Sequence, residues 1–266
     1  MPVYGSAKPT SNTTTALSGS NLVVSGQGVN TGATRSDYRS LLSVLQLGAT
    51  SPQVPACTGI VHEDGCALTA TDRSMDLQYV GAGSTNHATD GMIYFGISTY
   101  ADWPSIGNTT LPYVDIESDA TNPGFDYEIF LTTLADTDLL YAFVVDLAAG
   151  ALVWAHPVND NTGEVDTNVF DNNVVTFGTY KDTVGLPSTG SAPITYQVGT
   201  LGPYSFIDES PVISYNAGTP TIGTTQWIWP DQPGQVIPLS GSGPAQALVL
   251  HLHGAPGRRA EVINRP

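Results

Sequence analysis

Hydrophobic and polar residues alternate with a period of about two along most of the chain, and Gly, Pro, Asn or Asp interrupts the alternation about every 8 to 15 residues. A period of two places successive side chains on opposite faces of a strand, and the interrupting residues favour turns. The pattern therefore predicts many short strands joined by turns. These strands cover residues 22–24, 38–47, 77–80, 92–98, 113–117, 127–131, 139–147, 153–156, 174–177, 194–198, 212–215, 227–229 and 248–253.

Two segments, 39–47 and 179–186, have a pattern that a helix could also produce. Neither has capping residues at both ends, and Gly185 and Pro187 interrupt the second one. Alternating strands need a second sheet to cover their apolar face. We therefore expect an all-β fold, an antiparallel β-sandwich of immunoglobulin-like or jelly-roll-like type, with few short helices.

The pattern indicates one domain preceded by a short tail. Residues 1–16 are polar and lack periodicity, which predicts a flexible tail or the remnant of a linker. Strand signals continue without a true linker over 17–266, so we expect this range to form the β-sandwich. The stretch 81–91 is either a sub-boundary within it or a long hairpin loop.

Composition excludes several classes of partner. The 266 residues include 8 Lys or Arg and 24 Asp or Glu, which gives a formal charge of −16. Such a chain can neutralise few phosphates, so we expect no nucleic acid partner and no binding to anionic membranes. No stretch approaches the roughly 20 apolar residues of a spanning helix, so we expect no membrane insertion. Because 41% of the residues are hydrophobic, the chain should fold rather than remain disordered.

Two cysteines, Cys57 and Cys66, lie nine positions apart between turn-forming stretches. In an oxidising compartment they would close a small loop as a disulfide. The alternatives are a metal site that the two cysteines form with His62, or two unpaired thiols. Together with the scarcity of lysine, the cysteine pair indicates an extracellular, secreted protein. Residues 1–4 lack the features of a secretory signal, so we expect a mature chain or a piece cut from a larger one.

Four acidic residues surround one predicted turn and are candidate calcium ligands. Asp115 and Glu117 alternate on a predicted strand and face the same side, whereas Asp119 and Asp126 lie in the following loop. Calcium takes six to eight oxygen ligands, and these carboxylates could supply several of them. The alternative is a solvated strand edge and turn.

Histidine and tryptophan pairs provide two weaker candidates. His251 and His253 alternate on a predicted strand and could hold a transition metal, although a polar outer face of a terminal strand is the favoured interpretation. Trp227 and Trp229 would place two indoles on one strand face, where they could stack on sugar rings or pack in the core.

Motifs of nucleophilic and metal-dependent hydrolases are absent from the sequence. It contains no G-x-S-x-G elbow, no Gly-rich phosphate loop and no H-E-x-x-H helix motif. Paired carboxylates such as Asp208 with Glu209, or Asp166 with Asp171, could serve a glycosidase. Acids are common in this chain, so their spacing alone gives that interpretation little weight.

Several stretches together resemble the region that follows the protease domain in large secreted bacterial subtilisin-like serine proteases. The resemblance covers most of 17–263 and includes YRSLLSVLQLGATSP, GMIYFGISTYADW, YVDIESDATNPGFDYEIFL, DTNVFDNNVVTF and ALVLHLHGAPGRRAEVI. It implies a β-rich, non-catalytic extension. The acidic loop of that family often has the pattern Asp-x-Asp-x-Asp-Gly-Asp-Gly, and here Glu117 and Ala120 replace an Asp and a Gly.

The catalytic motifs of the family are missing. Its His-Gly-Thr motif has no counterpart, because His253 and Gly254 are followed by Ala255, and its Asp-Ser/Thr-Gly and Gly-Thr-Ser-Met motifs are also absent. We therefore expect a chain that is not itself an enzyme. The expected function is that of an accessory region that stabilises the protease or binds its substrate or a surface.

The expected partners follow from that function. They are a parent protease domain or an extracellular protein or polysaccharide. A free-standing secreted protein that self-assembles through its strand edges is the alternative, and a hydrolase with an unrecognised site is a third.

Overall fold

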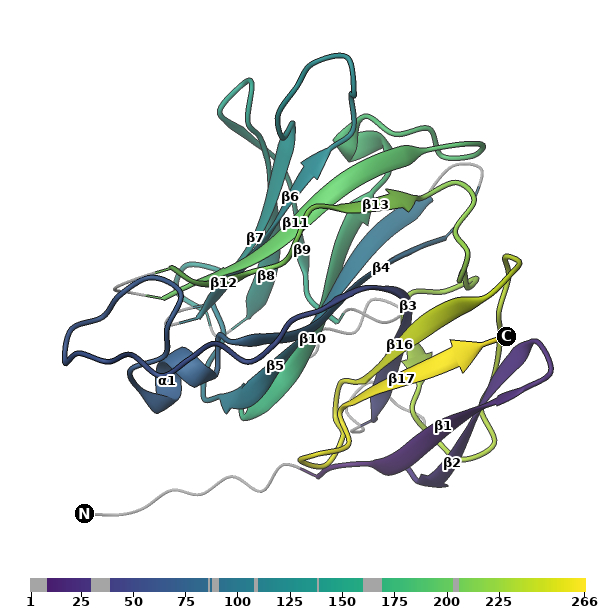
Figure 1. The fold of residues 1–266 in the computed structure, drawn as a ribbon. Coiled ribbons are helices and arrows are strands. Elements are labelled where there is room, and N and C mark those ends of the chain that lie inside the picture. Colours follow the sequence, from purple (N-terminus) through teal and green to yellow (C-terminus); the bar gives the residue numbers. More distant parts are fainter. Residues whose placement is uncertain are drawn as a thin grey trace.

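The computed structural model describes residues 9–29, 39–85, 87, 91–107, 110–137, 139–159, 169–202 and 206–266 (Figure 1). Strands make up 54% of the structure and helices 3%, and the strands form three packed sheets. All strand pairings between named strands are antiparallel. The prediction of an all-β antiparallel sandwich with few short helices is confirmed.

The central sheet runs through the middle of the molecule in Figure 1 and contains the first long strand of the chain. The strands of this sheet pair in the order β10-β5-β4-β3-β16-β17, and the short strand β14 pairs with β3. These strands are β10 (Asn172–Tyr180), β5 (Met92–Trp103), β4 (Leu77–Ser84), β3 (Leu41–Thr50), β16 (Ala245–His251), β17 (Ala260–Arg265) and β14 (Trp229–Pro230).

Two further sheets pack against the central one. The larger has the order β12-β11-β6-β7-β8-β9, with β13 paired to β11, and the smaller has the order β1-β2-β15. Their strands are β12 (Phe206–Glu209), β11 (Pro193–Leu201), β6 (Leu111–Glu117), β7 (Tyr127–Thr133), β8 (Leu140–Asp146), β9 (Ala151–Pro157), β13 (Ile213–Asn216), β1 (Asn12–Ser18), β2 (Asn21–Gln27) and β15 (Val236–Pro238).

Both of these sheets cover the same face of the central sheet. Ala82 of β4 packs in the core shared with the larger sheet, and its cross-strand partner on β3 is Gln46. Val44, two positions before Gln46, packs in the core beneath β2 and β15. Because residues two apart on a strand face the same side, the two covering sheets meet in a seam over Gln46. We call this boundary the seam.

Two short helical turns interrupt the strands. α1 (Ala70–Arg73) begins with a capping box in which Thr69 and Asp72 exchange hydrogen bonds with each other's backbone N–H groups. The segment 179–186 contributes only the 3₁₀ turn η1 (Asp182–Val184), which ends at Gly185 with a φ of 70°. That left-handed conformation suits glycine and stops the turn.

The helix alternative for 39–47 is wrong, because residues 41–50 form β3. Residues 41–45 are all buried, so both faces of this strand lie in the core, as a central strand requires.

The tail predicted over 1–16 is too long at its C-terminal end. β1 starts at Asn12 and pairs with β2 through its whole length, so residues 12–16 belong to the small sheet. Residues 1–8 lie outside the described residues.

The stretch 81–91 begins inside β4, which continues to Ser84 and pairs with β5 in the same sheet. It therefore joins two neighbouring strands, as the hairpin interpretation requires.

The polar outer face predicted for His251 and His253 is also wrong, because both residues are buried. His251 Nδ1 lies 3.1 Å from Asp231 Oδ2, and its Nε2 lies 3.5 Å from Glu261 Oε2. Thr13 of β1 also hydrogen-bonds Asp231. These contacts bind the first strand to β16 and β17, which is why polar side chains occupy an interior position.

We call His251, Asp231, Glu261 and Thr13 the His251 cluster. The charge on His251 sets the strength of the ion pairs in this cluster. Burial alone would lower the pKa of His251, but the hydrogen bonds and charges of Asp231 and Glu261 raise it to about 9. Burial likewise opposes ionisation of Asp231, and the hydrogen bond and charge of His251 nevertheless lower its pKa. The pair is therefore charged at neutral pH.

A raised pKa in the folded state makes stability depend on pH. The contribution of His251 to the free energy of unfolding is fully present below the pKa of about 6.5 that it has in the unfolded chain, and it is lost as pH rises through about 9. We expect the unfolding free energy in urea to fall by roughly 3 kcal/mol between pH 6 and pH 9.5 from this group. The variant His251→Gln should lack this part of the decline, whereas His87→Gln, at an exposed site, should retain it. Equal pH dependence in the two variants would contradict this assignment.

Candidate ligand-binding groove

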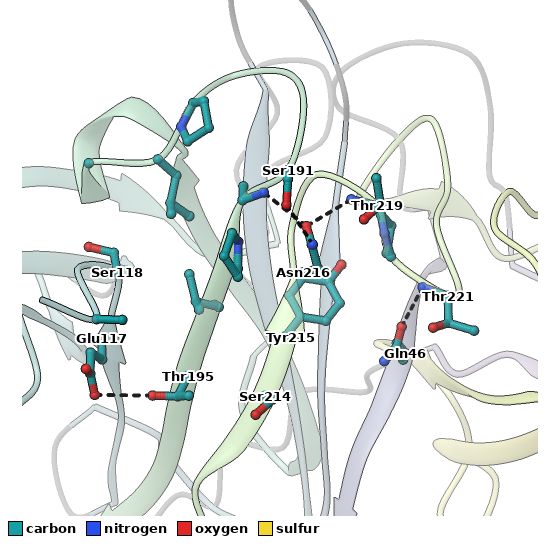
Figure 2. A pocket seen from close by; sticks show the side chains of 18 residues that line it. Gln46, Glu117, Ser118, Ser191, Thr195, Ser214, Tyr215, Asn216, Thr219 and Thr221 are labelled. Carbon is teal, nitrogen blue, oxygen red and sulfur yellow. Dashed lines mark hydrogen bonds between the residues drawn. The ribbon is translucent and has the colours of Figure 1, made fainter.

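A groove of about 600 Å³ lies at the seam (Figure 2). Pockets of about 300 to 1,000 Å³ are typical of sites for small ligands. One wall comes from β11 and β13, the other comes from the loop 219–221, and Gln46 of β3 contributes from the central sheet. The groove extends over the end of β6 to Glu117 and Ser118.

Asn216 holds the wall of the groove together. Its Oδ1 accepts a hydrogen bond from the backbone N–H of Ala192 at 3.0 Å, and it also accepts from Gly218 and from Thr219, which Figure 2 labels beside it. Its Nδ2 donates to Ser191 Oγ at 3.1 Å. One amide side chain therefore fixes both the segment before β11 and the turn after β13.

Gln46 has the corresponding role on the opposite side. Its Oε1 accepts hydrogen bonds from the backbone N–H groups of Thr221 and Ile222 at 2.9 and 3.3 Å. The seam explains why β3, whose neighbouring positions are apolar, carries an amide here. At this point neither covering sheet reaches over the strand, and the backbone N–H groups of the loop 219–222 need a hydrogen-bond acceptor.

The lining combines hydroxyl groups with apolar surface and is almost uncharged. Among its described residues, six serines and threonines contribute hydroxyls, prolines and aliphatic side chains supply most of the exposed surface, and Glu117 is the single ionisable acid or base besides the buried Tyr215. Thr195 Oγ1 lies 3.5 Å from Glu117 Oε2. This arrangement can donate and accept hydrogen bonds to an uncharged polar ligand.

The four candidate calcium ligands do not converge. Asp115 lies on the outer face of β6 opposite Glu128, and Glu117 lies at the groove. Asp126 accepts hydrogen bonds from the backbone N–H groups of Ser118 and Asp119, so it organises the turn itself. Asp119 accepts from Thr121.

Asp115 interacts with Glu128 and Glu209 and not with the other three candidate ligands. Burial, and then the charges of Glu128 and Glu209, raise the pKa of Asp115 to about 6. No group of three or more His, Cys, Asp or Glu side chains able to hold a metal ion occurs within the described ranges. The geometry therefore gives the calcium hypothesis no support.

The two tryptophans do not share a strand face. β14 contains only Trp229 and Pro230, and Trp229 is buried beneath the small sheet with its Nε1 donating to Gln226 O at 3.0 Å. Trp227 is half-buried and packs edge-on against Tyr94 on the other face of the central sheet. Of the two alternatives for this pair, sugar stacking or core packing, the burial of Trp229 agrees with core packing, although the two indoles do not share one strand face.

Cys57 and Cys66 form a disulfide with an S–S length of 2.02 Å, as the sequence predicted. The metal alternative is excluded for these sulfurs. His62 lies instead 3.4 Å from Asp72 of α1.

The proposed carboxylate pairs have other roles or lie elsewhere. Asp208 accepts hydrogen bonds from Ser51 Oγ and the backbone N–H of Leu77, whereas Glu209 accepts from Tyr113. Asp166 lies outside the described residues.

Sequence reasoning singled out Glu117, as a candidate calcium ligand, but did not predict the groove that it lines. The residues of the groove come from β3, β6, β11, β13 and three loops, and apart from the acidic stretch after β6 none of them belongs to a recognisable motif. One signal was available, because residues 210–230 contain no charged side chain although the chain is strongly acidic.

Comparisons with protein-family models, with curated proteins and with solved structures found no match to this chain. Within the part of the chain that the structure describes, no helix has the length and apolar character needed to cross a membrane.

The role of Asn216 can be tested by two substitutions. Asn216→Ala removes the acceptor of three backbone N–H groups and should lower the unfolding free energy by about 1 to 3 kcal/mol. Asn216→Asp keeps a carbonyl-like acceptor at the same place and should lose less than half as much. Urea denaturation of the three proteins measures the difference. Equal losses would show that the accepted hydrogen bonds do not hold the wall.

Proposed function

We propose that this chain is a non-catalytic, extracellular accessory region of a subtilisin-like serine protease, and that its groove holds a polymer close to the protease. The observation that carries the proposal is the groove itself, which is open, nearly uncharged and lined by hydroxyl groups together with apolar surface. Such a lining supplies hydrogen bonds to a neutral polymer. The resemblance of 17–263 to the region after the protease domain supports the choice of parent protein.

Tethering explains why a binding region would serve a protease. A module that holds substrate or cell-envelope material converts an encounter in solution into one within the same assembly, and so raises the effective concentration. Weak binding is then sufficient. The Cys57–Cys66 disulfide supports an extracellular setting, because such bonds persist in oxidising compartments.

Self-assembly is the second candidate, and strand β9 favours it. β9 is the last strand of the larger sheet and exposes Leu152 and Val153, at 57% and 44%. Edge strands of this kind can pair with another chain. The ladder with β8 is irregular at Val153, however, and such a bulge opposes edge pairing, so self-assembly ranks second.

Retention on immobilised polymers tests the proposed function. We expect the purified chain to be retained on at least one of chitin, cellulose and gelatin. Ser214→Trp places an indole in the groove and should reduce retention at least about fivefold, which corresponds to about 1 kcal/mol.

The matched control is Ser25→Trp, which changes an exposed strand serine on β2 outside the groove. It should bind like the unaltered chain. Absence of retention on all three polymers, or equal retention of both variants, would refute the proposed function.

A further inference from the structure

The free edge of β13 faces the groove. β13 pairs with β11 on one side, and within the described residues it has no paired strand on the other. Figure 2 shows Ser214, Tyr215 and Asn216 along this strand, with Gln46 and Thr221 on the opposite wall. The side of β13 that lacks a partner strand is therefore open to a ligand in the groove.

The backbone groups that point into this opening can be identified from the ladder. Ala217 donates its N–H to the carbonyl of Ala192 at 2.8 Å. Hydrogen bonding alternates along an antiparallel pair, so Tyr215 directs its N–H and C=O toward β11. Ser214 and Asn216 then direct theirs away from β11. None of these four backbone groups has a backbone partner among the described residues.

Their spacing matches a polypeptide strand. Two N–H groups and two C=O groups, separated by one intervening residue, are the pattern that an added antiparallel or parallel strand pairs with. A polysaccharide carries no backbone of that repeat. The groove also extends across the neighbouring strands from β13 to Glu117, because Glu117 pairs with Thr195 and Thr195 pairs with Ser214, so side chains of a bound segment can reach the face of the sheet.

One common protection of an edge strand, charged side chains, is missing here. Exposed edges in soluble proteins commonly carry charged side chains that keep other strands away. Residues 210–230, which include β13 and the opposite wall, carry none. The single acid at the far end, Glu117, and the charge of −16 on the chain disfavour an acidic segment.

We propose that the groove binds an extended, uncharged polypeptide segment that adds as a strand to the free edge of β13. This inference rests on the proposed function and specifies the polymer as polypeptide. Ser214 and Asn216 supply main-chain hydrogen bonds, and the hydroxyls and prolines of the walls accept small polar side chains. A protease region of this kind would hold unfolded protein substrate.

Peptides with selectively blocked backbones test the strand pairing. The probes are three fluorescein-labelled neutral heptapeptides of alternating Thr, Val and Ser, titrated with the full chain and followed by anisotropy. Each is also made with N-methyl groups on its even or on its odd residues. One of the two N-methylated forms should lose binding about three- to tenfold or more, because only one set of N–H groups faces β13.

A matched pair of variants tests the protein side. Ser214→Pro removes an N–H that faces the groove but none that pairs with β11, and it should weaken peptide binding about three- to tenfold. Ser214→Ala removes the hydroxyl and keeps that N–H, so it should bind nearly as well as the unaltered chain. Near-ultraviolet circular dichroism shows whether each variant is folded, and the N-methyl comparison does not depend on any variant.

The outcomes separate this inference from the proposed function. Failure of all three peptides, or equal binding of both N-methylated forms, overturns strand addition. If the peptides do not bind but the chain is retained on chitin or cellulose, and Ser214→Trp abolishes that retention, the proposed function stands and the ligand is a polysaccharide. If neither peptide nor polymer binds, both are wrong.

Discussion

The fold depends on one requirement, which is that other parts of the chain must cover both faces of the central sheet. Strand β3 makes this plain, because residues 41–45 are buried on both sides. Two separate sheets share one face, the larger over β4, β5 and β10 and the smaller over β3 and β16. Neither covers the whole face alone. The seam between them follows directly, and the groove occupies it.

Polar side chains at the seam serve the backbone of the adjoining loops. Gln46 and Asn216 together accept five backbone N–H hydrogen bonds from segments that no strand pairs with. The His251 cluster has a similar role below the small sheet, where it secures β1 through Asp231 and Thr13. In both places a costly buried or half-buried polar group is retained because it replaces hydrogen bonds that sheet pairing does not supply.

Period-two patterning was sufficient to predict the all-β sandwich and most strand positions, since alternation is local and persists through each strand. The disulfide could also be predicted, because its cysteines lie only nine positions apart. Errors arose where tertiary contacts decide. His251 looks like an exposed strand residue until Asp231 is placed beside it, and Trp227 and Trp229 occupy opposite sides of the central sheet. The groove joins segments as far apart as Gln46 and Thr221, a proximity that one sequence cannot reveal.

Amide hydrogen exchange of β13, measured by NMR, tests most directly whether its outer edge is unpaired. In the ligand-free chain, the N–H of Tyr215 should be protected by its bond to β11, whereas those of Ser214 and Asn216 should exchange much faster. Addition of a neutral peptide should slow the exchange of Ser214 and Asn216 and leave Tyr215 unchanged. Strong protection of all three amides in the free chain would show that the edge is already paired and would contradict the binding groove described above.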